Sequence, residues 1–369
     1  MKLKALLLTL LLPIGLAANY PTLADESVRL NYSLNELHPI WRDRIQSFLD
    51  KDVIPLIDLE SRLKRKDGKR YLEDSLDTMD ALGIALIAFD TNQAKKDGRD
   101  GYRWETYSVE LTNAYPDRFI PTTNGGTNRN WFRQKDDDKY SYIYQLEKYI
   151  DSGEYAIMGE LEVRHYWSNG SCKRGRGRDI DMPLNSENGH RLFSLSERTG
   201  VPFVIHLEPE DKPLEDLEQM LSAYPGAKVI IAHFTQIRNP SEETKFDPQF
   251  VRYLLSKYSN LYYDLSIGEP GRRYKCTDEL DTYIWKVDDE NPFGRQEDKL
   301  KPEYKDILNE FSDRFVAAFD YGGGRPPLAT FLHRRVSNIR LIISDLSTQA
   351  KHNIGYRNAW KLLTGKDWD

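Results

Sequence analysis

Short apolar runs recur along the chain, and most of them are continuous rather than alternating. Eight runs are rich in β-branched or aromatic residues and have the length of a strand. Continuous apolar runs are typical of parallel strands that are buried on both faces. The predicted strands cover residues 53–60, 84–90, 119–124, 156–163, 201–208, 228–234, 261–266 and 315–320.

Amphipathic stretches with helical periodicity separate these strands. They cover residues 72–82, 142–150, 189–198, 214–224 and 248–257, with Asn188 and Pro213 at two expected helix starts. Eight strands alternating with helices predict a single-domain α/β fold, a (β/α)₈ TIM barrel. A doubly wound open sheet is the main alternative, but no glycine-rich phosphate-binding motif follows any predicted strand. We expect the barrel domain to span residues 51–369, with a leading segment at 25–50 and a helical tail at 331–369.

The start of the chain differs from the rest. Lys2 and Lys4 precede an apolar run over residues 5–18, as in the first two regions of a secretory signal peptide. This run is shorter than the roughly 20 apolar residues that span a bilayer. Small residues allow cleavage after Ala17 or after Ala24. We therefore expect residues 1–24 to be a signal peptide and the mature protein to be exported, periplasmic or secreted, with no membrane attachment.

Composition narrows the classes of partner. The 369 residues include 52 basic and 58 acidic ones, for a net charge of −6. Loss of Lys2 and Lys4 with the leader changes this charge to −8. Nucleic-acid binders are usually basic, so we expect a small-molecule substrate and no nucleic acid. The chain has only two cysteines, which excludes a four-cysteine zinc site but permits a Cys172–Cys276 disulfide after export.

Nearly every predicted strand ends in a residue that can bind a metal or move a proton. In a barrel these ends share one face, where catalysis takes place. A single histidine or aspartate there is commonly a structural cap, whereas two histidines with several carboxylates favour a functional site. The strand-end residues are Asp58, Glu60, Arg62, Asp90, Asn124, Glu160, Glu162, Arg164, His165, His206, His233, Asp264, Ser266 and Asp320.

Several of these stretches resemble the amidohydrolase superfamily, in particular its amidohydrolase-related branch of metal-dependent barrel hydrolases. The similar stretches are residues 55–63, 201–208, 227–234, 260–266, 315–322 and 353–363. His206, His233 and Asp320 match the family's positions on strands five, six and eight. The resemblance implies that His206 binds a metal and that His233 binds metal or polarises the substrate. It also implies that Asp320 binds metal and acts as the general base on the attacking water.

Strand one departs from that family. Where the family has two metal-binding histidines, this chain has Glu60, Ser61 and Arg62. Glu60 can still offer an oxygen ligand. Arg62 cannot be a ligand because its guanidinium has no free lone pair and stays charged. Arg62 could instead pair with Glu60 or bind a carboxylate or phosphate of the substrate.

A rebuilt site would hold one divalent metal, zinc or alternatively manganese, on Glu60, His206 and Asp320, with Glu160 or Glu162 added. Asp320 and the metal would then deprotonate a water, and His233 would stabilise the developing oxyanion. The bond attacked would be an ester, an amide or another C–N or C–O bond. Two alternatives stay open: the same side chains could perform acid–base chemistry without metal, or the barrel could bind an anion without catalysis.

Basic residues cluster after three strands on the same face. They are Arg164 and His165 with the loop at 172–178, Arg272, Arg273 and Lys275, and the lysines and arginines of residues 64–70. Such a rim predicts an anionic substrate. The residues predicted to contact the substrate are Arg62, Glu162, Arg164 and His165. The alternative is a set of solvated loops. Tyr166, Trp167 and Tyr274 could stack on a ring of the substrate or merely cover the core.

Overall fold

The structure is a computed structural model that describes most of the chain. The described residues are 28–92, 94–95, 102–126, 131, 141–166, 179–236, 245–274, 278–280, 282–286, 300–322 and 327–369. The predicted signal peptide, Trp167, the loop at 172–178, Lys275 and both cysteines lie outside them.

Parallel strands form at all eight predicted positions. They are β1 (Leu56–Arg62), β2 (Ile84–Asn92), β5 (Phe119–Ile120) with β6 (Asn124–Gly125), β7 (Met158–His165), β9 (Phe203–Leu207), β10 (Val229–Ile231), β11 (Leu261–Asp264) and β14 (Phe315–Val316). All of their pairings with one another are parallel. The prediction of an α/β fold with parallel strands is confirmed.

These strands lie in two sheets that meet along both margins. One sheet has the order β1-β2-β5, with β6 also paired to β2, and the other has the order β14-β11-β10-β9-β7-β8. Parallel bridges join Thr122 to Ile157 and Gly126 to Leu161 at one margin, and Arg62 to Gly322 at the other. The backbone amide of Arg62 also donates to the carbonyl of Tyr321, at 2.6 Å. The first and last parallel strands are therefore neighbours.

The other short strands among the described residues form antiparallel pairs. β8 (Ile180–Asp181) pairs with the end of β7, β3 (Ala94–Lys95) pairs with β4 (Tyr102–Arg103), and β12 (Arg273–Tyr274) pairs with β13 (Glu279–Leu280).

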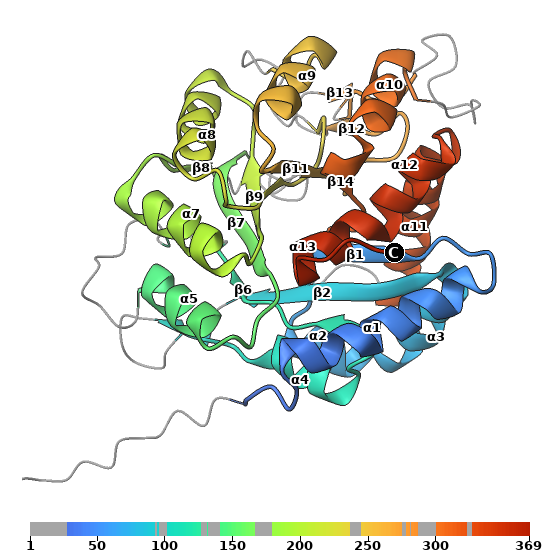
Figure 1. Ribbon diagram of the computed structural model, residues 1–369. Helices are drawn as coiled ribbons and strands as arrows, with labels where there is room; N and C mark the ends of the chain where they lie inside the picture. Colours follow the sequence, from blue (N-terminus) through green and yellow to red (C-terminus); the bar gives the residue numbers. More distant parts are fainter. Residues whose placement is uncertain are drawn as a thin grey trace, which may run out of the picture.

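Helices surround the strands (Figure 1). They are α1 (Leu34–Leu49), α2 (Arg65–Tyr71), α3 (Glu73–Leu82), α4 (Tyr107–Ala114), α5 (Tyr142–Asp151), α7 (Glu187–Thr199), α8 (Asp211–Ala223), α9 (Pro248–Lys257), α10 (Pro302–Glu310), α11 (Leu328–Ser344), α12 (Thr348–His352) and α13 (Asn358–Thr364). A 3₁₀ turn, η1 (Ser312–Arg314), precedes β14, and a π-helical turn, η2 (Asn353–Arg357), joins α12 to α13.

Local sequence explains where several helices begin. The hydroxyl of Ser33 accepts from the backbone of Glu36, whose carboxylate bonds back to Ser33, so α1 begins with a capping box. Ser186 caps α7, and α8 starts at Asp211. Asn188 and Pro213 therefore lie within the first turns of these helices rather than at their caps.

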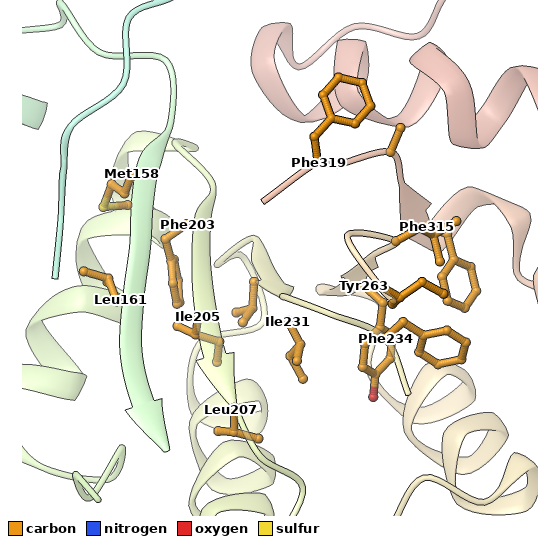
Figure 2. Close-up of a cluster of buried hydrophobic side chains, with 14 of the residues drawn as sticks. Met158, Leu161, Phe203, Ile205, Leu207, Ile231, Phe234, Tyr263, Phe315 and Phe319 are labelled. Carbon is orange, nitrogen blue, oxygen red and sulfur yellow. The ribbon is translucent and has the colours of Figure 1, made fainter. Parts of the chain in front are cut away.

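The core has an inner and an outer layer. The inner layer collects small and branched side chains from strands of both sheets and is closed at one end by α1 and α13. The outer layer packs the strands against the helices, and Figure 2 shows part of it, including Phe203, Ile205 and Phe315. Because one inner layer serves both sheets, the strand ends converge on a common region. Among the described residues, no helix has the length and apolarity needed to cross a membrane.

Candidate metal and catalytic site

The candidate site residues lie where the parallel strands end. Glu60, Glu160 and His206 are on strands β1, β7 and β9, whereas His233 and Asp320 lie in the turns beyond the ends of β10 and β14. The first four are at most 9% exposed, and the side chain of Asp320 is 19% exposed. The expected convergence of these residues at one face follows from the parallel arrangement.

Glu160, His206 and His233 form the tightest group. Within the part of the chain that the structure describes, these three residues offer ligand atoms that all lie within 4.8 Å of one another. Oε1 of Glu160 is 3.2 Å from Nδ1 of His206 and 3.7 Å from Nε2 of His233. Glu60 and Asp320, which were also predicted as ligands, fall outside this group.

The spacing of this group fits a metal ion. Ligand atoms of a tetrahedral zinc site, with bonds of about 2.1 Å, lie about 3.4 Å apart. The distances from Oε1 of Glu160 to the two imidazoles are close to this value. Nitrogen and carboxylate donors also suit zinc and manganese. Glu160, His206 and His233 are therefore the residues that could hold a metal.

His206 has a second carboxylate neighbour. Its Nε2 lies 3.3 Å from Oε1 of Glu208, a residue outside the predicted site. Glu208 follows His206 by two positions, so the alternation of a strand was the available signal. The ring of His165 lies 4.1 Å from that of His206, centroid to centroid.

Arg62 does not pair with Glu60. Its Nε and NH2 bind the two oxygens of Asp90 at 2.7 and 3.1 Å, and NH2 also reaches Oε2 of Glu160 at 3.3 Å. The guanidinium therefore contacts the oxygen of Glu160 that faces away from the histidines. Of the two roles predicted for Arg62, pairing with Glu60 is excluded. For the other role, binding a carboxylate or phosphate of the substrate, NH1 is without a partner among the described residues.

The ion pair of Arg62 and Asp90 is packed against two glycines. A Cβ at Gly125 would lie 2.4 Å from Oδ2 of Asp90 and 2.8 Å from NH2 of Arg62. A Cβ at Gly159 would lie 2.6 Å from Cβ of Asp90 and 3.0 Å from the carbonyl of Thr123. Any larger residue at these positions would displace the pair.

Opposing effects set the charge of Glu160. Burial alone would raise its pKa, but the contacts with His206 and His233 and the charge of Arg62 hold the pKa well below its ordinary value. Glu160 is therefore a carboxylate at neutral pH.

Glu60 and Asp320 are neighbours across the margin between the two sheets. The amide of Asp320 donates to the carbonyl of Glu60 at 2.8 Å. Burial raises the pKa of Glu60 well above its ordinary value, and the charges of Asp320 and Glu160 raise it further. Oε2 of Glu60 is buried without a partner among the described residues. This combination is what a carboxylate near an additional cation would show.

Arg335 approaches Asp320 from helix α11. Its NH2 lies 3.6 Å from Oδ2 of Asp320, and its NH1 donates to the carbonyl of Ile267 at 2.6 Å. Arg335 is only 2% exposed. It lies on a helix rather than on one of the parallel strands, so no strand-end pattern could have identified it.

His233 is held by the end of the next strand. Its backbone has a φ of 62°, in the left-handed region. Nδ1 lies 2.6 Å from Oγ of Ser266, and that hydroxyl donates to Oδ1 of Asp264 at 2.6 Å. Asp264 and Ser266 were noted at the end of their strand but were not assigned a role.

The remaining predicted residues are all on β7. Arg164 forms ion pairs with Glu210 and Asp179, and its guanidinium lies 3.9 Å from the ring centre of Tyr166. Glu162 is buried and pairs with His206 in the β7–β9 register. A register shift between Glu162 and Arg164 explains why His165, at an odd position relative to Glu160, still reaches His206.

The predicted basic rim is described only in part. The loop at 172–178 and Lys275 lie outside the described residues. Arg65 forms ion pairs with Glu105 and Glu110. Attraction of an anionic substrate by this rim stays a prediction.

The chain is similar to known proteins in two comparisons. A family model described as amidohydrolase matches residues 170–364, whereas no curated protein matches significantly. Among solved structures, a 2,6-dihydroxybenzoate decarboxylase from Rhizobium is 13% identical, with 84% of this chain and 98% of that chain covered and a TM-score of 0.47. A putative amidohydrolase from Staphylococcus aureus is 14% identical, with 84% and 99% covered and a TM-score of 0.48.

The family match includes His206, His233 and Asp320 but not the first strand or Glu160. The predicted family resemblance is confirmed, while the unusual Glu60 and Arg62 lie before the matched residues. Because the amidohydrolase family model matches more than half of the chain, the chain belongs to the amidohydrolase family.

Proposed function

We propose that the chain is a metal-dependent hydrolase that acts on a small molecule. The observation that carries the proposal is the buried group of Glu160, His206 and His233, whose ligand atoms lie within 4.8 Å of one another. Glu60 and Asp320 add two further carboxylates near this group, and a divalent cation would offset the negative charge of all three carboxylates. Zinc fits this donor set, and manganese is the second choice.

The bound metal would supply a Lewis acid and lower the pKa of a water at the site. Asp320 accepts the proton of the attacking water on its carboxylate, as a general base. Arg335, at 3.6 Å, restricts the orientation of that carboxylate. Glu60, whose buried Oε2 has no partner among the described residues, adds a ligand oxygen.

His233 takes a role that differs from oxyanion binding alone. Its Nδ1 faces the carbonyl and the hydroxyl of Ser266, which favours a proton on Nδ1 and a lone pair on Nε2. A lone pair suits a metal ligand. His233 stabilises an oxyanion only in its protonated form.

Arg62 is the proposed anchor for an anionic part of the substrate. Asp90 and Glu160 bind its Nε and NH2, and NH1 keeps two donors for a carboxylate or phosphate. Glu162, Arg164 and His165 lie further along β7 and complete the substrate side of the site.

We also propose that the eight parallel segments form a (β/α)₈ barrel and that residues 51–369 are one domain. The bridges at both margins and the shared inner core support this proposal. Export, to the periplasm or out of the cell, rests on the pattern of residues 1–24. Sequencing the mature N-terminus tests it, and a first residue of Ala18 or Asp25 is expected.

Elemental analysis of the purified protein tests the metal. We expect about one divalent ion per chain, and loss of that ion in Glu160→Gln and His206→Ala. His190→Ala is the matched control, because His190 lies on α7 at the surface and, among the described residues, hydrogen-bonds Tyr224 and Asn185. Asp320→Asn should keep the ion and lose hydrolysis, which separates a base from a ligand.

Two results would contradict the proposal. A wild-type protein without metal after purification and metal reconstitution would exclude the metal mechanism. Metal that survives both Glu160→Gln and His206→Ala would place the ion elsewhere.

The same geometry also favours a second candidate, acid–base chemistry without metal. Both ring nitrogens of His206 face carboxylates, those of Glu160 and Glu208, at 3.2 and 3.3 Å. An imidazolium in this position would satisfy both. Activity that persists at full rate in metal-free protein would support this candidate.

Substrate charge can be tested directly. Carboxylated or phosphorylated esters should be hydrolysed faster than neutral ones, and the difference should shrink in high salt. Arg62→Lys should weaken the preference because lysine cannot bind Asp90 in a fork. Equal rates on neutral and anionic esters would remove the anion site from the proposal.

A further inference from the structure

We propose that Asp264 and Ser266 are positioning residues that keep the proton of His233 on Nδ1 and aim Nε2 at Glu160. Both residues act through His233, which is the member of the metal group that they contact. The inference rests on the proposed function for its purpose, since an unprotonated Nε2 is what a metal ligand requires.

The backbone of His233 is constrained first. Its φ of 62° lies in the left-handed region, which a histidine adopts only where the surrounding structure supports it. Oδ1 of Asp264 accepts the amide of His233 at 2.8 Å, and the carbonyl of Asp264 accepts the amide of Phe234 at 3.0 Å. The neighbouring strand therefore holds the turn that carries the imidazole.

The hydroxyl of Ser266 then fixes the ring. It donates to Oδ1 of Asp264 at 2.6 Å, so its proton is already used. Toward Nδ1 of His233, at 2.6 Å, Ser266 can only accept. The carbonyl of Ser266 also faces Nδ1, at 3.1 Å, and a carbonyl never donates. Both contacts require a proton on Nδ1.

The other nitrogen faces Glu160. Nε2 of His233 lies 3.7 Å from Oε1 of Glu160. A lone pair and a carboxylate oxygen at this distance repel each other unless a cation lies between them. A metal ion, or a second proton on the ring in metal-free protein, meets that requirement, and in both states Nδ1 stays protonated.

The environment of the three residues makes the arrangement rigid. Asp264, Ser266 and His233 are at most 3% exposed, so water cannot compete for these bonds. Oδ1 of Asp264 also accepts the amide of Ser266 at 3.0 Å, which closes a small ring of bonds at the end of β11. These bonds fix the orientation of the Ser266 hydroxyl and of Oδ1 of Asp264 relative to the imidazole.

Nitrogen-15 NMR of labelled histidine side chains tests the inference directly. In the wild-type protein, the His233 resonances, assigned with His233→Gln, should show a protonated Nδ1 with and without zinc. In Ser266→Ala part of the proton population should move to Nε2 in metal-free protein, because only the longer contact with the backbone carbonyl, at 3.1 Å, still favours Nδ1. Zinc affinity, measured by competition with a chelator, should fall about 10- to 100-fold.

Two further variants make the result interpretable. Ser196→Ala removes another buried hydroxyl that makes two hydrogen bonds, to Val201 and Lys228, and should leave zinc affinity unchanged. Asp264→Asn keeps an acceptor at the Oδ1 position and should keep Nδ1 protonated.

Three outcomes would overturn the inference. They are an unprotonated Nδ1 in the wild-type protein, wild-type zinc affinity in a folded Ser266→Ala variant, and an equal loss in Ser196→Ala. The first of them needs no variant, so the inference stays testable if Ser266→Ala does not fold. A wild-type protein that binds no metal contradicts the proposed function, whereas the proton position of His233 still decides this inference.

Discussion

At the scale of single residues, Arg62 shows how burial changes the contribution of an ion pair to the stability of the fold. Its side chain is 13% exposed and that of Asp90 is 4% exposed, and both pair with fixed geometry. Removing one member of such a pair leaves the other charge buried, which costs about 3–5 kcal/mol. We therefore expect Arg62→Met to lower the free energy of unfolding by about 3–5 kcal/mol, measured by urea denaturation.

The chain contains a matched control for this prediction. Arg198 also binds an aspartate with two bonds, at 2.6 and 2.9 Å to Asp151, but both side chains are nearly half exposed. Arg198→Met should change the free energy of unfolding by less than about 1 kcal/mol. Similar losses in the two variants would mean that the Arg62 pair is not effectively buried.

Residue chemistry made part of the site predictable. His206, His233 and Asp320 end predicted apolar strands, and their match to the positions of the amidohydrolase resemblance selected them from the other strand-end residues. The partners of Arg62 were not predictable, because Asp90 and Glu160 lie 28 and 98 residues away in the sequence. His165 was assigned to the site, but its contact with His206 depends on a register shift that strand alternation does not reveal.

At the scale of elements, two strands support a neighbouring turn with the same hydrogen-bonding arrangement. Oδ1 of Asp58 on β1 accepts the amide of Phe319 at 3.0 Å, next to Asp320, whose φ is 52°. Oδ1 of Asp264 on β11 accepts the amide of His233 in the same way. Each aspartate therefore supports a left-handed site residue at the end of a neighbouring strand, and in each case a nearby serine completes the bonds.

Element positions were more predictable than element ends. All eight parallel strands lie within or next to the apolar runs, but β10 and β14 are only three and two residues long. Their predicted ends instead contain the turns that carry His233 and Asp320, because positive φ values break the strand there. Residues 25–50 were expected only to precede the barrel, yet most of them form α1.

Helix α1 packs on α13 partly through a histidine. His38 lies 5.7 Å from Trp41 and 6.2 Å from Trp360 between ring centroids, and both of its nitrogens are buried without partners among the described residues. Burial lowers its pKa, and the charge of Lys366 lowers it further. The unfolded chain therefore binds a proton more readily, and stability falls as the pH drops below about 6.5.

Replacement of this histidine tests the packing of the two helices. Between pH 7.5 and 5.5, the Tm of His38→Phe should fall by about 1–2 °C less than that of the wild type, in scanning calorimetry. His333→Phe on α11 is the control and should behave as the wild type does. An equal pH dependence of His38→Phe and the wild type would show that His38 is hydrated in the folded state.

At the scale of the whole molecule, the two sheets depend on one interior. The inner core contains Ile57 and Leu86 from one sheet and Val204, Ile230 and Val316 from the other. The turn η2 adds a seam near the C-terminus, where Gly355 packs on the start of β1 and the amide of Ala317 donates to the carbonyl of Ile354 at 3.0 Å. Neither sheet can lose this interior alone, so the described residues should unfold as one cooperative unit.

A substitution where η2 packs on the start of β1 measures how strongly the two sheets are coupled. A Cβ at position 355 would lie 2.9 Å from both the carbonyl of Pro55 and a methyl group of Ile54, so Gly355→Ala should cost about 1–3 kcal/mol. In native-state hydrogen exchange, the slowest amides of β2 and of β10 should lose equal protection, although β2 is paired with β1 and β10 is not. Circular dichroism and tryptophan fluorescence should also report one coincident transition. Loss of protection confined to β1 and β2 would divide the chain into two independently stable units, because a shared interior cannot loosen on one side only.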